Sequence, residues 1–225
     1  MNVSGTLSFF RLFRDPSLCL PHHTVSTFNH LPIPLSRAFN KADGEKKVDI
    51  RAVVLDKDNC FAVPKENEVY KPERFEELRK AYPGSRLLIV SNSAGTLSDP
   101  TGAEADLLEK NTGVKVLRHN TKGMQDDFRR YAFPDITQKP GCHSDVLSYL
   151  RNAPDTGVTH ASQVAIVGDR LFTDVMMANM MGSYGFWIKD GVVEEKGLFV
   201  KLERSLAGFL TRRGYSPPFP QSHFE

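Results

Sequence analysis

The chain lacks several features that would assign it to a specialised class of protein. No run of apolar residues approaches the roughly 20 that a helix needs to span a bilayer. The three cysteines are far apart, and their spacing fits neither a disulfide framework nor a zinc site. The formal net charge is only +2, so the chain lacks the excess of basic residues that is typical of nucleic-acid-binding domains. These absences argue against a helical membrane span, a disulfide scaffold and a nucleic-acid-binding protein.

Length and composition favour one folded domain. The 225 residues, of which 40% are apolar and 25% charged, suffice for a single α/β domain with a sizeable core. We expect this domain over 48–212, after an N-terminal segment at 1–47 and before a loose, proline-containing tail at 213–225. Residues 15–36 hold four prolines and little periodicity, which indicates an extended surface or mobile segment. Because the basic N-terminus lacks the apolar stretch of a secretory signal, any targeting would be of the mitochondrial kind.

Short apolar runs alternate with helical patterns along the expected domain. Strands are expected at 52–55, 87–90 and 164–167, with weaker candidates at 114–117 and 184–188, and helices at 72–80, 103–110, 144–151, 173–181 and 199–210. Such alternation predicts an α/β fold with a parallel sheet and helices on both faces. Ligands of such folds bind beyond the carboxyl ends of the strands.

Polar side chains gather at that edge of the expected sheet. Those that follow the three clearest strands are Asp56, Asp58, Ser91, Asn92, Asp169 and Asp174. Lys139, in a Lys-Pro-Gly sequence, is expected to join them. Clustered carboxylates repel one another unless a cation lies among them, and Mg²⁺ binds one or two carboxylates while leaving room for water and a phosphate oxygen. The pattern therefore predicts magnesium-dependent phosphate chemistry, with one aspartate as the nucleophile and another as the general acid/base.

Four segments carry a resemblance to a known superfamily. In chain order VVLDKDNC, LLIVSNS, KPG and VAIVGDRLFTD resemble the signatures of the haloacid dehalogenase superfamily, subclass IIIA, over about residues 51–190. The resemblance implies a Rossmann-like fold in which Asp56 is the nucleophile and a metal ligand, and Asp58 is the acid/base, its backbone carbonyl also reaching Mg²⁺. It further implies that Ser91, Asn92 and Lys139 bind phosphate, and that Asp169 is the main outer metal ligand, supported by Asp174. Cys60 stands where the superfamily usually has Thr or Val.

A narrower resemblance covers nearly the whole chain. VLRHNTK, KPGCH and GSYGFWI, together with NVSGTL, PSLC and TFNHLPIP near the start, resemble the fungal mitochondrial phosphatidylglycerophosphate phosphatases. These enzymes remove the terminal phosphate of phosphatidylglycerol phosphate on the way to cardiolipin. The resemblance implies a phospholipid substrate and a peripheral location on the matrix side of the mitochondrial inner membrane. A charged stretch at 41–47 and a segment at 123–138 depart from it.

The gaps between the signatures leave no room for a large cap domain. An open site suits a substrate whose bulk stays outside, such as a lipid head group, and Arg118, His119, Lys122 and Arg170 are candidates for binding it. An ordinary solvated loop would also explain the first three. Other readings remain: a phosphatase acting on a soluble phosphomonoester or a phosphoprotein, or a non-catalytic scaffold domain, against which the intact Asp56 and Asp58 argue.

The first residues form an amphipathic pattern. If 5–14 are helical, Phe9, Phe10, Leu12 and Phe13 share one side, and Arg11 and Arg14 lie opposite. This arrangement predicts contact with an anionic membrane surface. The alternatives are a transit peptide that is removed, or a helix that docks on the domain or a neighbouring subunit. A homo-oligomer is compatible with the sequence but not specified by it.

Overall fold

The fold is built around one parallel β-sheet. The computed structural model describes residues 11–39, 47–96, 98–118, 139–194 and 197–221. The strands are β1 (His23–Val25), β2 (Ala52–Leu55), β3 (Leu87–Ile89), β4 (Lys115–Val116), β5 (Val164–Gly168) and β6 (Tyr184–Ile188). They lie in the order β1-β6-β5-β2-β3-β4, and every pair is parallel. The predicted α/β class is confirmed.

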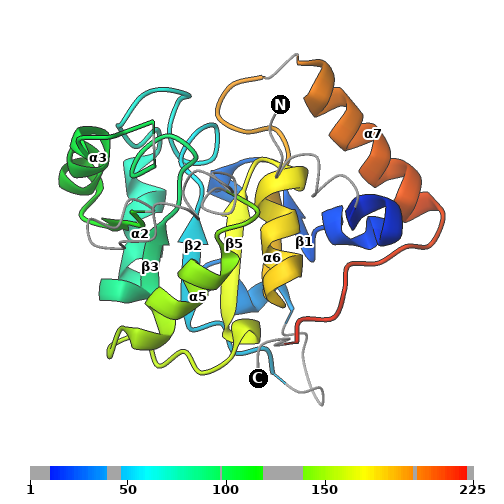
Figure 1. The fold of residues 1–225 in the computed structure, drawn as a ribbon, viewed down its shortest axis with the longest axis horizontal. Coiled ribbons are helices and arrows are strands. Elements are labelled where there is room, and N and C mark those ends of the chain that lie inside the picture. The colour runs from blue at the N-terminus through cyan, green and yellow to red at the C-terminus, as the bar shows by residue number, and fades with distance from the viewer. Residues whose placement is uncertain (1–10, 40–46, 97, 119–138, 195–196, 222–225) are drawn as a thin grey trace, which may run out of the picture.

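Helices cover both faces of this sheet (Figure 1). The longer helices are α2 (Pro72–Ala81), α3 (Ala103–Thr112), α5 (His143–Asn152), α6 (Met176–Met181) and α7 (Leu198–Arg212). Successive side chains of a strand point to opposite faces. Val53 and Leu55 therefore pack with α2 and α3, whereas Ala52 and Val54 pack with α5 and α6.

The order of the strands creates a natural ligand site. The chain runs outward from β2 through β3 to β4, and then returns to the other side of β2 as β5 and β6. In open parallel sheets, ligands bind where the strand order reverses, beyond the carboxyl ends of the strands. That point lies between β2 and β5, which are both followed by acidic residues.

The folded domain begins earlier than the sequence suggested. Its expected start near residue 48 is wrong, because β1 pairs with β6 and completes the sheet. Leu31 and Leu35 are buried in the core, and the backbone N–H of Leu35 donates to the Tyr82 hydroxyl at 2.9 Å. The periodicity was too weak to reveal this role because the segment contains one three-residue strand and several short 3₁₀ turns.

The expected membrane helix is described only at 11–14, which is helical. Leu12, predicted to face the membrane, instead lies buried against Leu20, Ala207 and Leu210. That prediction is wrong for Leu12, because the side chain fills the space between α7 and the turn at Pro16–Cys19. Arg11, Phe13 and Arg14 are exposed. Phe9 and Phe10 lie outside the described residues.

Two further expectations need correction. The tail is not loose as far as residue 221: His22 Nε2 bonds the Pro218 carbonyl at 2.8 Å, and Pro220 is buried. The helix expected at 173–181 is a π-helical turn, Leu171–Val175, followed by α6. The carbonyl of Arg170 accepts from the N–H groups of both Asp174 and Val175, which widens the turn.

Within the residues that the structure describes, no helix has the length and apolar character needed to cross a membrane.

Candidate active site

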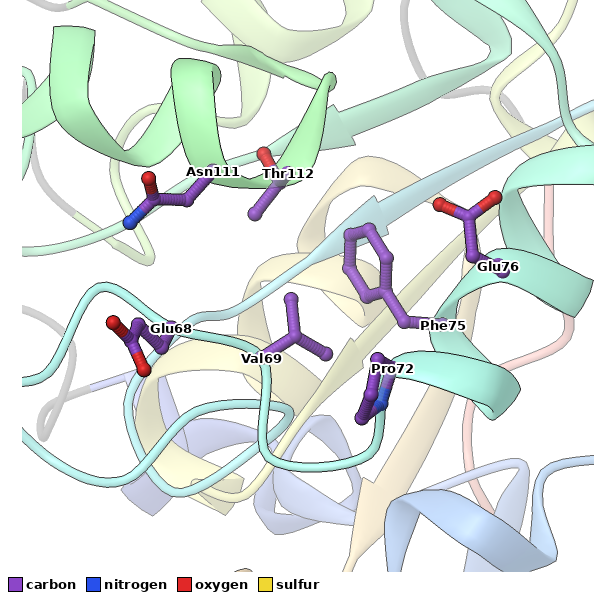
Figure 2. A pocket seen from close by; sticks show the side chains of 7 residues that line it. All are labelled: Glu68, Val69, Pro72, Phe75, Glu76, Asn111 and Thr112. Atoms are coloured by element: carbon purple, nitrogen blue, oxygen red, sulfur yellow. The ribbon is translucent and has the colours of Figure 1, made fainter.

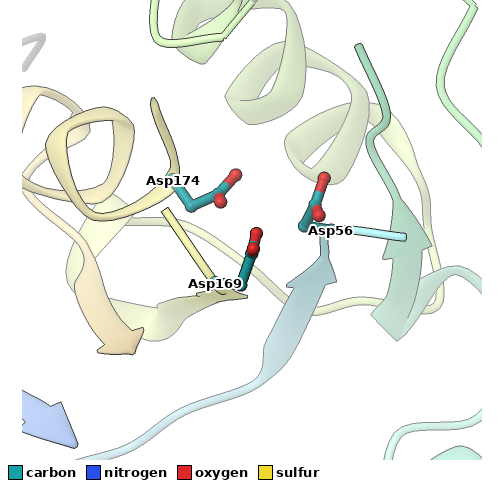
Figure 3. Close-up of side chains that lie close together, drawn as sticks. All are labelled: Asp56, Asp169 and Asp174. Atoms are coloured by element: carbon teal, nitrogen blue, oxygen red, sulfur yellow. The ribbon is translucent and has the colours of Figure 1, made fainter. Parts of the chain in front are cut away.

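Three carboxylates converge at the carboxyl end of the sheet (Figure 3). Asp56 follows β2, Asp169 follows β5, and Asp174 lies in the π-helical turn after β5. Each offers an oxygen within 4.8 Å of the others. The sequence predicted this gathering, because the ends of neighbouring parallel strands share one edge of the sheet.

Lys139 bridges two of these carboxylates. Its ammonium donates to Asp174 Oδ1 at 2.6 Å and also contacts Asp56 Oδ1. All three side chains are almost fully removed from solvent. The structure thus brings Lys139, which lies 83 residues after Asp56, into the carboxylate cluster, and its phosphate-binding role stays a prediction.

Burial and charge perturb both partners of this pair. Burial raises the pKa of Asp56 to about 7, and repulsion from Asp174 adds to this effect although the Lys139 ammonium opposes it. Burial alone would lower the pKa of Lys139, but attraction to Asp174 and Asp56 outweighs burial and raises it. Asp56 and Asp174 thus share one buried ammonium, and Asp169 lies beside them, so the cluster favours additional positive charge.

The donor set fits a hard divalent cation. Carboxylate oxygens are the ligands that Mg²⁺ and Ca²⁺ prefer, and the three acids lie close enough to share one ion. Gly168 makes this packing possible, because a Cβ there would lie 2.3 Å from the Asp174 carboxyl carbon. Asp56, Asp169 and Asp174 are therefore the residues that would hold the ion.

Ser91 and Asn92 lie at the end of the neighbouring strand, β3. Ser91 is buried, and its hydroxyl accepts from the N–H groups of Ser93 and Ala94 at 3.1 and 3.3 Å. Asn92 Oδ1 accepts from the N–H of Lys139 at 3.2 Å. The turn after β3 is therefore tied to the segment that carries the lysine.

Asp58 does not join the carboxylate cluster. Its Oδ1 accepts from the Lys65 N–H at 2.8 Å and lies 3.3 Å from the Lys57 ammonium. Lys57 is fully buried and also donates to the Glu66 carbonyl at 3.2 Å. The loop after β2 thus holds the Asp58 carboxylate aside, and its acid/base role stays a prediction.

Three residues that support the site were not predicted from the sequence. Asn59 Nδ2 lies 3.4 Å from Asp169 Oδ2, while its Oδ1 accepts from the N–H groups of Val192 and Val193. Trp187 Nε1 donates to the Asp169 carbonyl at 2.9 Å. Glu203 is buried on α7 and accepts from the Phe172 N–H at 3.1 Å.

The sequence offered little indication that these three residues support the site. Asn59 lies within the first signature, VVLDKDNC, and adopts a left-handed backbone conformation, with φ 58°, which Asn tolerates. Glu203 is the one acid in a helix whose other charged residues are basic, which could have suggested a buried partner. Trp187 lies in GSYGFWI, a segment that carries the family resemblance, but nothing in that segment indicated a contact with Asp169.

The predicted head-group residues are only partly placed near the cluster. Arg170 Nε lies 3.4 Å from Asp169 Oδ2. Arg118 instead pairs with Asp106 and Glu109 at 2.8 and 3.4 Å, so acids on α3 already neutralise its charge. His119 and Lys122 lie outside the described residues.

A separate cavity of about 320 Å³ lies between α2 and the end of α3 (Figure 2). Its lining residues are Glu68, Val69, Pro72, Phe75, Glu76, Asn111 and Thr112. This lining includes none of the clustered acids and presents two carboxylates but no basic side chain. A phosphorylated substrate would therefore be repelled rather than bound there.

We expect Gly168→Ala to damage the site without disturbing the sheet. The added methyl would occupy the space of the Asp174 carboxyl group, which must then leave the cluster. We expect a loss of about 10–100-fold in apparent metal affinity or activity, as is typical when the support of a metal ligand is removed. Titration of activity with the metal measures this effect. Gly208→Ala is the matched control, because a methyl added there would have no other atom within 4 Å; equal behaviour of the two variants would contradict the expected role of Gly168.

The fold and site define a class of protein. The chain has a parallel sheet with an Asp-x-Asp after β2, a hydroxyl after β3, a lysine bound to the first acid, and two acids after β5. This arrangement is consistent with the resemblance to haloacid dehalogenase-type phosphatases. The model of the family described as mitochondrial PGP phosphatase matches residues 3–193, and the chain belongs to this family.

Curated relatives agree with this assignment. The chain is 46% identical to a mitochondrial phosphatidylglycerophosphatase of Saccharomyces cerevisiae, over 93% of this chain and 99% of the relative. It is 33% identical to a probable mitochondrial phosphatidylglycerophosphatase of Schizosaccharomyces pombe, over 90% of each chain. A chloroplastic phosphatidylglycerophosphate phosphatase of Chlamydomonas reinhardtii is 30% identical, over 96% of this chain and 72% of the relative. No solved structure shows significant similarity to the chain.

Proposed function

We propose that this protein hydrolyses the terminal phosphate of phosphatidylglycerol phosphate, yielding phosphatidylglycerol and inorganic phosphate for cardiolipin biosynthesis. The observation that carries this proposal is the 46% identity to a mitochondrial phosphatidylglycerophosphatase along almost the whole of both chains. The clustered residues at the ends of β2, β3 and β5 supply the chemistry that such a reaction needs.

Asp56 is the nucleophile in this proposal. One of its carboxylate oxygens attacks phosphorus, a phosphorus–oxygen bond to it forms, and the bond to the glycerol oxygen breaks. The Lys139 ammonium and the Ser91 hydroxyl hold the phosphoryl oxygens. A bound divalent cation, which we propose to be Mg²⁺, supplies positive charge that offsets the negative charge of the phosphate and the surrounding carboxylates.

Asp58 is first the general acid and then the general base in this proposal. Its protonated carboxyl group gives a proton to the departing glycerol oxygen. The resulting carboxylate then takes a proton from water, whose oxygen attacks phosphorus and releases phosphate from Asp56. Both roles require the side chain to leave the Lys65 N–H, with which it bonds in this structure, and to turn toward the phosphate.

We propose that the enzyme works as a peripheral protein on the matrix side of the mitochondrial inner membrane. The names of two relatives place them in mitochondria, and the substrate is a membrane lipid. Phe13 and Arg14 are exposed at the N-terminal helical turn, where they can meet an anionic membrane surface.

A side-by-side assay of purified protein tests the function. We expect hydrolysis of phosphatidylglycerol phosphate in mixed micelles to exceed that of glycerol 3-phosphate and of a phosphopeptide by at least about 10²-fold in kcat/KM, which corresponds to almost 3 kcal/mol of transition-state binding. Preference for glycerol 3-phosphate would indicate a small-molecule phosphatase, and preference for the phosphopeptide a protein phosphatase. Either result would overturn the proposed substrate.

A further inference from the structure

The outer side of α7 carries an exposed apolar ridge. Leu198, Leu202 and Phe209 are 84%, 52% and 47% exposed. At 100° per residue these three positions lie within about 40° of one another around the helix. Val200, Ala207 and Leu210 point the other way and are buried. The helix therefore has, besides the face that packs on the domain, a second apolar face that is largely open to solvent.

Basic side chains flank this ridge. Lys201 and Arg212 are exposed on α7, and the Arg213 guanidinium lies 5.0 Å from the centre of the Phe209 ring. The only acid of α7, Glu203, is buried on the opposite side. Every exposed charge of the helix is thus positive. An apolar stripe with basic flanks is the pattern of helices that lie in the surface of an anionic bilayer.

Another exposed apolar side chain, Phe13, lies on a segment that packs against α7. Leu12 packs against Ala207 and Leu210, so the turn at 11–14 lies beside α7, and Phe13 next to it is 75% exposed. Figure 1 shows this blue segment alongside the C-terminal half of α7. The N-terminal turn therefore packs beside α7, with the Phe13 side chain exposed next to that contact.

This surface is also tied to the active site. The loop before α7 is held by Asn59, which accepts from the Val192 and Val193 N–H groups and lies 3.4 Å from Asp169. Glu203, on α7, accepts a hydrogen bond from the N–H of Phe172, which lies in the π-helical turn that carries Asp174. Docking of α7 on a bilayer would therefore fix how the catalytic cluster is oriented relative to the membrane.

We propose that the outer face of α7, with Phe13, docks this enzyme on an anionic lipid bilayer. The proposal rests on the proposed function, in which the substrate is a lipid, and identifies the surface that meets the membrane. A second copy of the chain is a poorer occupant, because a symmetric dimer through this face would bring Lys201 and Arg212 of both copies together. Leu198, Leu202 and Phe209 enter the head-group boundary, and the basic side chains meet lipid phosphates.

Vesicle flotation of the full chain tests the proposal. The triple variant Leu198→Ser, Leu202→Ser, Phe209→Ser should bind phosphatidylcholine vesicles containing phosphatidylglycerol at least about tenfold more weakly than wild type, because three apolar insertions are lost. Tyr70→Ser, Leu107→Ser is the control, since these side chains are 52% and 46% exposed on other elements; it should bind as wild type. Wild-type binding should fall on pure phosphatidylcholine.

A charge-reversal variant tests the same surface if the serine variant does not fold. Lys201→Glu, Arg212→Glu should lose binding to the anionic vesicles, whereas Lys80→Glu, Lys110→Glu, at exposed positions on α2 and α3, should not. Light scattering and circular dichroism report assembly and fold. Wild-type vesicle binding by both α7 variants would overturn the proposal. So would a change of oligomeric state in the α7 variants with vesicle binding retained, because the face would then join copies of the chain.

The two proposals fail separately in these experiments. Hydrolysis of a short-chain, water-soluble phosphomonoester monitors the catalytic site without a membrane. If wild type binds vesicles through α7 but does not hydrolyse phosphatidylglycerol phosphate, the docking surface is supported and the proposed substrate is wrong. If it hydrolyses the lipid while α7 variants bind vesicles like wild type, the function stands and the docking surface is wrong.

Discussion

Asp56→Asn should reduce turnover of any phosphomonoester by at least about 10³-fold, because it removes the attacking anion. The substitution changes almost no volume at a buried position beside Lys139 and Asp174. It also removes one of three mutually repelling carboxylates. We therefore expect the thermal unfolding midpoint to stay near that of wild type while activity disappears.

Asp106→Asn provides the matched control for this experiment. Asp106 is an exposed acid on α3 that pairs with Arg118 at 2.8 Å, and it lies outside the cluster. Because exposed ion pairs contribute little, this variant should retain wild-type activity and stability. Substantial turnover by a folded, highly purified Asp56→Asn protein would exclude Asp56 as the nucleophile.

Removal of divalent metal should abolish activity as completely as loss of Asp56. Asp56 and Asp174 share the Lys139 ammonium, and Asp169 adds a third carboxylate beside them, so the cluster repels a phosphate until further positive charge is bound. EDTA should bring hydrolysis to background, and Mg²⁺ should restore it. Ca²⁺ should not, because it has the same charge but prefers more ligands and a looser geometry.

A ligand variant connects this metal requirement to the structure. Asp169→Asn should raise the Mg²⁺ concentration for half-maximal activity by at least about tenfold, since one carboxylate of the cluster loses its charge. The substitution leaves the Asp169 backbone carbonyl, which accepts from Trp187 Nε1, in place. Full activity in metal-free buffer would show that Lys139 alone suffices to balance the substrate charge.

The core of the site was predictable because it depends on short-range patterns. β2 and β5 are continuous apolar runs that lead into acids, and parallel strands bring such ends together. The expected place of Lys139 in the site rested on its Lys-Pro-Gly context and on the family resemblance. Nothing in its spacing indicates that a residue 83 positions from Asp56 would contact it.

Other parts of the structure depend on contacts that periodicity does not record. β1 has three residues and gains its place from pairing with β6. The outward face of α7 was visible as a helical pattern, but only the fold shows that Leu198 and Leu202 face solvent while Glu203 is buried. The burial of Leu12 likewise depends on α7, which is distant in sequence.

Trapping the covalent intermediate tests the central claim most directly. Enzyme mixed with phosphatidylglycerol phosphate under single-turnover conditions is quenched in acid and treated with borohydride, which reduces an acyl phosphate to an alcohol and releases phosphate. Peptide mass mapping should then find homoserine in place of Asp56, at a yield that rises and falls with time as turnover proceeds. Homoserine at another acid, or complete turnover with residue 56 unmodified at every time point, would contradict the account.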